Sequence, residues 1–222
     1  MLSSINDEAS PNWIPKNELQ NLMQWKFNQW DLDEMIVEDF DGSEYYLKSF
    51  YNCRRILGVG GFAFVAEAFD EKTNEYFALK VMEKQTSQEE ALDCIRNEAH
   101  ILKQINSDKV TKFWFLREFK SHIVLGMELC KGGSLRDVMK WRKAKGLEFS
   151  DDECATIITA ILRSIKEIHL LDIIHRDLKP ANFLFKDWKD LNSIRIADFG
   201  LAKKLSMNVN QIQTGSGGTL LY

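Results

Sequence analysis

The chain has 222 residues, of which 45% are hydrophobic and 28% are charged, enough for one large domain or two small lobes with cores of their own. Its net charge is −4 with both signs interspersed, no stretch reaches the ~20 apolar residues of a membrane span, and no cationic start precedes an apolar run, so we expect no nucleic-acid and no membrane partner. The four cysteines are far apart and form no CxxC pair, which argues against a disulfide framework or a zinc site and predicts a soluble cytoplasmic or nuclear protein.

Residues 1–48 form a polar and acidic extension ahead of the first domain. Between Asn17 and Met35, apolar residues recur three and four positions apart, which predicts a short amphipathic helix. Such a helix would either dock on the following domain or bind a partner, and the pattern is compatible with both. Its apolar face comprises Leu19, Leu22, Met23, Phe27 and Trp30.

Residues 49–131 change to the period of strands and predict a β-rich lobe. Three short apolar runs separated by turn residues indicate an antiparallel meander. Ser87 with Glu90 fits a capping box, so we expect a helix from there to Gln104. Two further apolar runs complete a five-stranded antiparallel sheet with one helix. The predicted strands are 53–57, 64–69, 76–82, 112–118 and 122–129.

Residues 132–222 are predominantly helical in pattern. One helix is predicted over 135–143, and a second over 150–171, where Ser150 and Glu153 form another capping box. The predicted fold is therefore α+β, with a small β-rich lobe followed by an α-rich one.

The most specific motif is the run HRDLKPAN at 175–182, followed by DFG at 198–200. These two blocks resemble the catalytic loop and the metal-binding loop of the protein kinase family, serine/threonine type. The resemblance implies a two-lobed protein-kinase-like fold. It also implies that ATP, Mg²⁺ and a protein substrate meet between these loops.

The chemistry of the two blocks supports the resemblance. Phosphoryl transfer depends on positioning and charge stabilisation, so a carboxylate that accepts a hydroxyl proton must lie beside a group that steadies the phosphoryl. Asp177 is the candidate base and Lys179 the candidate stabiliser. Asn182 and Asp198 offer the hard oxygen ligands that Mg²⁺ prefers. In the family, the residue at His175 is structural and packs beneath the phenylalanine of the DFG block.

Residues 58–61 (GVGG) lie between the first two predicted strands, where glycines let backbone amides approach phosphate oxygens. They resemble the kinase Gly-rich loop, although Ala63 stands where its third glycine is expected. Lys80, if it points inward from the third strand, needs an anion to offset its desolvation, and Glu98 on the predicted helix can supply one. By resemblance, Lys80 would hold the α- and β-phosphates and Glu98 would hold Lys80.

The resemblance also implies an adenine pocket. Val65 and Ala78 would cover the base from one side and Leu184 from the other. The linker at 127–130 would offer backbone hydrogen bonds from Glu128 and Cys130, with Met127 at the back of the pocket. The implied ATP contacts are Leu57, Gly58, Gly60, Gly61, Val65, Ala78, Lys80, Met127, Glu128, Cys130 and Leu184.

The resemblance covers residues 50–222 and implies a serine or threonine acceptor, because Lys179 and the closing block at 218–222, with Thr219, are of that type. It ends before the family's Ala-Pro-Glu block, so we expect an incomplete C-lobe ending in the activation segment at Tyr222. Two other functions remain open: a non-catalytic nucleotide-binding scaffold, and a small-molecule kinase, which the closing block disfavours. The oligomeric state is not indicated.

Two further expectations follow from the resemblance. Arg176 would be a buried cation that stays unpaired until a phosphate on the activation segment meets it, and Thr214 and Ser216 are the acceptors best placed to carry that phosphate. Kinases that select arginine three residues before the acceptor place acids where this chain has Ser134 and Ala181. We therefore expect no strong preference for arginine there.

Overall fold

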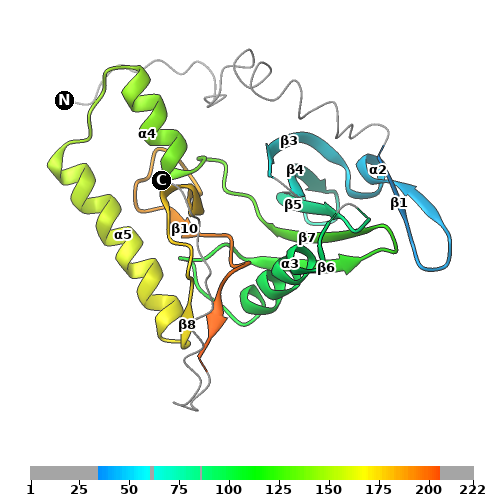
Figure 1. Ribbon diagram of the computed structural model, residues 1–222. Helices are drawn as coiled ribbons and strands as arrows, with labels where there is room; N and C mark the ends of the chain where they lie inside the picture. Colours follow the sequence, from blue (N-terminus) through cyan, green and yellow to red (C-terminus); the bar gives the residue numbers. More distant parts are fainter. Residues whose placement is uncertain (1–34, 61–62, 86, 206–222) are drawn as a thin grey trace. The chain divides into compact units, whose positions relative to one another are not determined.

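The computed structural model describes residues 35–60, 63–85 and 87–205 (Figure 1). The chain divides into two units, Met1–Asp31 and Leu32–Tyr222, and the description concerns the second. The predicted amphipathic helix, apart from Met35, lies outside the described residues. Gly61, Thr214 and Ser216 also lie outside them.

A five-stranded antiparallel sheet dominates the first part of the described chain, in the order β3-β4-β5-β7-β6. Its two sides differ because side chains alternate along each strand: Phe64, Ala66 and Ala68 of β4 are buried, whereas their neighbours are half-exposed. The predicted sheet is confirmed, with ends within two residues of those expected. The strands are β3 Cys53–Val59, β4 Ala63–Asp70, β5 Glu75–Glu83, β6 Phe113–Glu118 and β7 His122–Glu128.

Helix α3, Glu89–Leu102, packs on this sheet against β6 and β7. Its buried face includes Leu92, Ile95, Ala99 and Leu102, as the spacing predicts. The predicted capping box is wrong. The N-cap is Gln88, without a side-chain cap bond, so Glu90 is the second helical residue and cannot close a box with Ser87, which requires the third.

The second part of the described chain is helical, with short strands (Figure 1). Ser150 and Glu153 form the predicted capping box of α5, and Ser134 with Asp137 forms a second box that opens α4 and was not predicted. Helix α5 exposes Ile158 and Leu162. The elements are α4 Leu135–Ala144, α5 Asp151–His169, β8 Ile173–Ile174, the 3-10 turn Pro180–Asn182, β9 Phe183–Phe185, β10 Ile194–Ile196 and β11 Lys203–Lys204.

Two hydrophobic cores match these two parts. One lies between the sheet and α3, around Ile95, Ile123 and Leu125. The other lies among α4, α5 and the short strands, around Ile168 and Phe199. The expected α+β, two-lobed arrangement is therefore confirmed.

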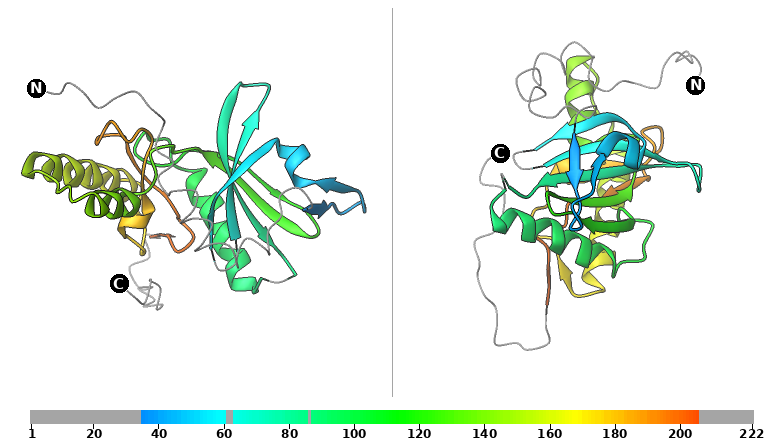
Figure 2. Two further views of the ribbon diagram at one scale, coloured as in Figure 1. Left: turned by 90° about the horizontal axis from the view of Figure 1, so that it is seen from above. Right: turned by 90° about the vertical axis from the view of Figure 1, so that its right-hand side faces the viewer.

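A hairpin and a short helix precede the sheet and were not predicted: β1 Ile36–Glu38, β2 Glu44–Tyr46 and α2 Leu47–Tyr51. Figure 2 (left) shows the hairpin at the end of the sheet that is farthest from α4 and α5. Val37 and Leu47 are completely buried, which makes this segment part of the folded body.

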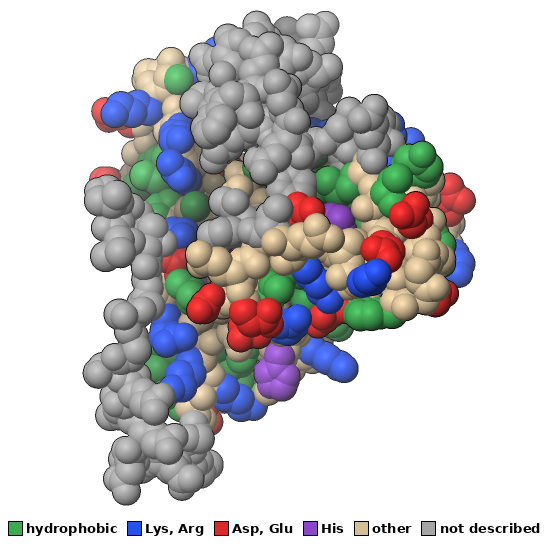
Figure 3. Space-filling view, turned by 45° about the vertical axis from the view of Figure 1, so that its right-hand side comes forward, with side chains coloured by type: hydrophobic (Ala, Val, Ile, Leu, Met, Phe, Trp, Pro, Cys, Tyr) green, Lys and Arg blue, Asp and Glu red, His purple; other side chains and the backbone are tan. Residues whose placement is uncertain are grey.

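Surface charge and helix length are the two features that bear on the expected partners. In the middle of the face drawn in Figure 3, acidic and basic side chains lie next to one another. Among the residues that the structure describes, no helix combines the length and the apolar character needed to cross a bilayer.

Candidate active site

A buried ion pair joins the sheet to α3. The Nζ of Lys80, on β5, lies 2.6 Å from Oε2 of Glu98 and 3.4 Å from Oδ1 of Asp198. The Glu98 side chain is only 2% exposed. Desolvation lowers the pKa of Lys80, but the carboxylates of Glu98 and Asp198 outweigh it and raise that pKa above its ordinary value. The ammonium group therefore stays charged at the meeting point of these elements.

Helix α3 also holds the backbone around the DFG block. Oε1 of Glu98 accepts a 3.3 Å hydrogen bond from the Phe199 amide. The side-chain amide of Asn97 donates to the carbonyl oxygens of Phe199, Gly200 and Ala202, at 3.3, 3.0 and 2.9 Å. Sequence reasoning missed Asn97, because no local pattern links it to a segment about one hundred residues away.

The loop after β8 assembles the second cluster. Lys179 Nζ lies 2.6 Å from Asp177 Oδ2. The side-chain amide of Asn182 donates to the backbone oxygen of Asp177 at 2.9 Å and to its Oδ2 at 3.2 Å. The Asp177 side chain is 9% exposed. A buried carboxylate is thus fixed by a cation and an amide, as positioning of a reacting hydroxyl requires.

His175 supports this loop from beneath. Its Nε2 lies 3.0 Å from the Ala197 carbonyl oxygen, its Nδ1 lies 3.3 Å from the Asp177 amide, and its ring packs edge-on against Phe199 at 4.9 Å. Burial lowers the pKa of His175. A neutral ring that donates from Nε2 and accepts at Nδ1 satisfies both contacts. The structural position expected for His175 matches this geometry.

Asn182 and Asp198 flank one hairpin. Asn182 directly precedes β9 and Asp198 follows β10, and β9 pairs antiparallel with β10, so the two ends meet. The Ala197 amide donates to the Asn182 carbonyl oxygen at 2.9 Å. Within the described residues no hydrogen bond involves Asn182 Oδ1 or Asp198 Oδ2. Two such oxygens suit Mg²⁺, provided that phosphate and water oxygens complete its shell.

The residues expected around adenine are brought together in part. Ala78 and Met127 belong to the core cluster of the sheet lobe, and Leu57 and Val65 are partly buried and pack against it. Leu184 lies on β9, outside that cluster, and forms an isolated bridge with Ser134. In the glycine segment, the Gly60 amide donates to the Ala63 carbonyl oxygen at 2.7 Å, and Gly58 pairs with Val65.

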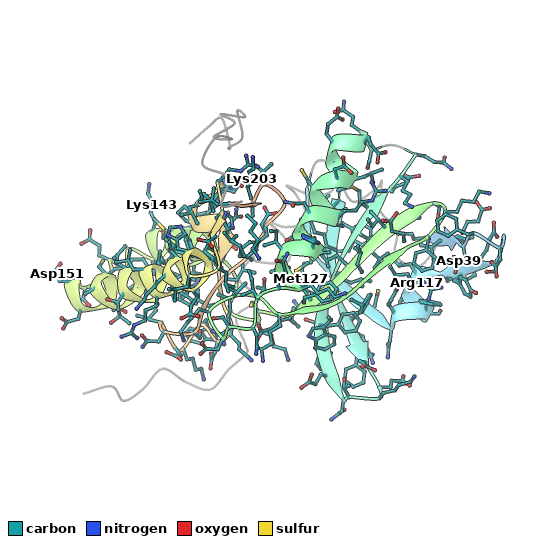
Figure 4. The ribbon with its side chains drawn as sticks, turned by 90° about the horizontal axis from the view of Figure 1, so that it is seen from below. Asp39, Arg117, Met127, Lys143, Asp151 and Lys203 are labelled. Atoms are coloured by element: carbon teal, nitrogen blue, oxygen red, sulfur yellow. The ribbon has the colours of Figure 1, made fainter. Side chains whose placement is uncertain are left out.

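Beyond β7, the backbone of Cys130 has no hydrogen-bond partner within the described residues. Desolvation, reinforced by the Glu128 carboxylate, raises the pKa of the Cys130 thiol to about 12. The thiol is therefore protonated and poorly reactive at neutral pH. Figure 4 labels Met127 where β7 leaves the sheet toward the helical lobe.

The Glu128 side chain anchors this linker to the β9–β10 hairpin, and sequence reasoning missed that role. Its carboxylate lies 2.9 Å from Lys186 Nζ and 3.8 Å from Arg195 Nε, and it is 3.4 Å from the Lys112 amide. Arg195 is buried, and its Nε has no hydrogen-bond partner within the described residues. Glu128 is the acid that compensates the charge of this buried guanidinium. Arg195 lies three residues before Asp198.

The linker then runs directly along the same hairpin. The Gly132 amide donates to the Phe185 carbonyl oxygen at 2.8 Å, and the Phe185 amide donates to that of Gly133 at 2.8 Å. A Cβ atom at Gly132 would lie 2.5 Å from Phe185 Cβ and 2.7 Å from the Trp188 nitrogen. Only glycine permits this approach.

Arg176 differs from expectation. Its side chain is exposed rather than buried, and its Nε donates to the Leu201 carbonyl oxygen at 2.6 Å. Its φ of 66° lies in the left-handed region, which few residues other than glycine adopt. Solvent and a carbonyl therefore replace the buried environment that was predicted.

Residues 51–222 match the model of the protein kinase domain. Serine/threonine-protein kinase 33 of Mus musculus is 34% identical over 184 residues, covering 79% of this chain and 36% of that protein. A "probable myosin light chain kinase" of Dictyostelium discoideum is 32% identical over 171 residues, covering 77% of this chain and 48% of that protein. The chain thus spans between about a third and a half of the length of these relatives.

Proposed function

Because the chain belongs to the protein kinase family, we propose that it binds ATP with Mg²⁺ and transfers the γ-phosphoryl group to a serine or threonine hydroxyl of a protein substrate. The observation that carries the proposal is the linked pair of clusters: Lys80 with Glu98 and Asp198, and Asp177 with Lys179 and Asn182. They supply a phosphate-binding cation, a base and oxygen ligands for a divalent cation.

In this proposal the side chains position and stabilise. Lys80 holds the α- and β-phosphates, and Glu98 keeps its ammonium group in place. Asp177 orients the substrate hydroxyl and accepts its proton, while Lys179 steadies the charge on the transferring group. Asn182 and Asp198 hold Mg²⁺, which when bound neutralises charge on the phosphate oxygens. The buried pairing of Lys80 and of Asp177 supports these roles, because it fixes both groups before the substrate arrives.

For the base of the nucleotide, we propose contacts with the apolar side chains named above and with the linker backbone. The unpartnered Cys130 backbone supports this, because an amide and a carbonyl group without a partner can pair with the edge of adenine. Met127, 8% exposed at the end of β7, would limit the depth of the pocket. Gly58 and Gly60 would let backbone amides approach the phosphates, with Gly61 beside them.

Regulation by the segment at 206–222 remains a proposal that extends the first. A phosphate on Thr214 or Ser216 would meet Arg176, whose exposed guanidinium is accessible to it. Activity should fall on phosphatase treatment and in the double variant Thr214→Ala with Ser216→Ala. Unchanged activity in both cases would exclude this switch.

We also propose a location in the cytoplasm or nucleus. The free state of all four cysteines supports it, because these compartments are reducing.

The test compares nucleotide binding with phosphoryl transfer in the same preparation of the 222-residue chain. We expect Mg²⁺-dependent binding of ATP and incorporation of labelled phosphate into a generic protein substrate. The matched control is Asp177→Asn, which keeps the size of the side chain but removes the base. Binding without any transfer by the unmodified chain would favour the scaffold, and absence of binding would contradict both functions.

A further inference from the structure

The segment of residues 36–51, here named the N-terminal brace, lies almost wholly before the region that matches the family, which starts at residue 51. It consists of the β1–β2 hairpin and α2, and it packs on the turn between β6 and β7. Since this segment belongs to the folded body, its contacts can influence the position of α3, which carries Glu98.

Polar contacts fasten the brace to the β6–β7 turn. The Glu38 amide donates to Ser121 Oγ at 2.8 Å, and the Ser121 amide donates to the Glu38 carbonyl oxygen at 3.3 Å. The Glu38 carboxylate pairs with Lys120 at 2.5 Å. Asp39 pairs with Arg117 at 2.7 Å, and Figure 4 shows these two residues next to one another. Backbone and side chains together thus fix the turn to the hairpin.

Apolar contacts close the same junction. Phe119, in the turn, is completely buried and lies edge-on to Phe50 at 5.9 Å. The Arg117 guanidinium lies over both rings, at 4.5 Å from the Phe119 centroid and 4.9 Å from the Phe50 centroid. Tyr51 stacks on Phe115 of β6 at 5.6 Å. The turn therefore has its place set from the side of the brace.

The last residue of β6, directly before this turn, holds α3. Glu118 receives two contacts from the Arg96 guanidinium, at 3.0 and 3.2 Å, and one from Lys84 Nζ at 3.0 Å. The hydrogen bond from Arg96 lowers the pKa of Glu118 to about 2. Lys84 also lies 5.4 Å from the ring centroid of Phe40, which belongs to the brace. Glu118 is thus a junction between β6 and α3, and Lys84 connects it to the hairpin.

Arg96 is the immediate neighbour of Asn97 and lies two residues before Glu98, on the helix that holds both Lys80 and the DFG backbone. We propose that the N-terminal brace positions α3 for the reaction: it fixes the β6–β7 turn, Glu118 at the adjoining end of β6 holds Arg96, and Glu98 is thereby kept on Lys80. The inference rests on the proposed function for its consequence in turnover. The coupling itself depends only on the contacts above.

The first test measures amide hydrogen exchange in the 222-residue chain. The double variant Glu38→Gln with Asp39→Asn removes the charges of the hairpin at half-buried positions, and Glu118→Gln breaks the junction itself. We expect the amides of α3 to exchange about fivefold faster in both, while those of α5 keep their rates. The matched control is Arg55→Gln, which breaks the exposed pair with Glu67 between β3 and β4, away from the turn.

Faster exchange confined to residues 36–51, with α3 unchanged, would overturn the proposal. Phe40→Ala keeps the test decisive if the double variant does not fold, because this ring is 69% exposed and contributes no core. It should also speed the exchange of α3. The second readout is kinetic: turnover per folded molecule, with the folded fraction measured for each variant, should fall by about fivefold in the brace variants, with the KM for a peptide substrate unchanged. A fall in apparent turnover that the folded fraction fully accounts for would reflect general loss of stability and would overturn the positioning role.

The two readouts separate the inference from the proposed function. If the unmodified chain transfers no phosphate, the proposed function fails, yet the exchange of α3 still decides the coupling. If transfer occurs and the brace variants match the unmodified chain in turnover, the positioning role is wrong while the proposed function stands.

Discussion

Replacing Lys80 by methionine should destabilise the fold as well as stop the reaction. The change leaves a side chain of similar length but removes the cation 2.6 Å from Glu98, whose carboxylate is 2% exposed. Breaking a buried pair by removing one partner costs about 3–5 kcal/mol, because the remaining charge is uncompensated. The Phe199 amide still donates to Glu98, and the Lys80 position is 21% exposed, so we expect the lower end of that range, about 3 kcal/mol.

Urea unfolding of four proteins measures this: the unmodified chain, Lys80→Met, Glu98→Gln and the double variant. The midpoint for Lys80→Met should fall by about 1–2 M. The double variant should recover most of that loss, because the buried Glu98 charge is gone and the Asp198 carboxylate, 45% exposed, is solvated. Lys109→Met, which breaks an exposed pair with Asp108, is the control and should change stability by less than about 1 kcal/mol. If the free energy of unfolding of Lys80→Met lay within about 0.5 kcal/mol of that of the unmodified chain, the reasoning would be refuted.

Three further predictions concern catalysis, pH and substrate choice. Asp177→Ala should lower turnover by about 10²- to 10⁴-fold with ATP affinity nearly unchanged, and loss of ATP binding with turnover per bound ATP retained would contradict the role of base. Burial lowers the pKa of His175 below its ordinary 6.5, so the unfolded chain takes up a proton that the folded chain refuses, and stability should fall as the pH drops from 7 to 5. In His175→Phe the urea midpoint should fall less steeply as the pH drops. Some fall should remain, because burial also lowers the pKa of His122. A slope equal to that of the unmodified chain would exclude His175 as a cause. A peptide library should show no dominant arginine three residues before the acceptor, because Ala181 has no charge and the Ser134 hydroxyl is engaged in the cap of α4; dominant selection of arginine would oppose this.

Local chemistry made much of the fold predictable. The cap of α5 followed from Ser150 and Glu153, because a box needs only two residues three apart. The same rule failed at Ser87, one residue too early, since the pattern does not say which residue leaves the helical conformation first. The β1–β2 hairpin was missed because strands of three residues are too short to show an alternation.

The site was predictable where a motif names its own residues and unpredictable where partners are remote. Asp177, Lys179 and Asn182 lie in one loop, so their proximity follows from spacing. Asn97 reaches carbonyl groups about one hundred residues away, and Arg195 meets Glu128 only through the packing of the two lobes. Such contacts arise from tertiary folding and cannot be inferred from the local spacing of residues in a single sequence.

The contact of Gly132 with the β9–β10 hairpin has a consequence for sequence variation. Any side chain at this position would collide with backbone atoms of Phe185 and Trp188, which cannot move aside as a flexible side chain would. Alanine there should therefore be nearly as destabilising as a bulky residue. In a scan of all substitutions, the loss of stability should be similar for every residue and should not increase with the size of the side chain. Variation at residue 132 would then report on the path of the linker between the lobes, and not on the volume available in either core.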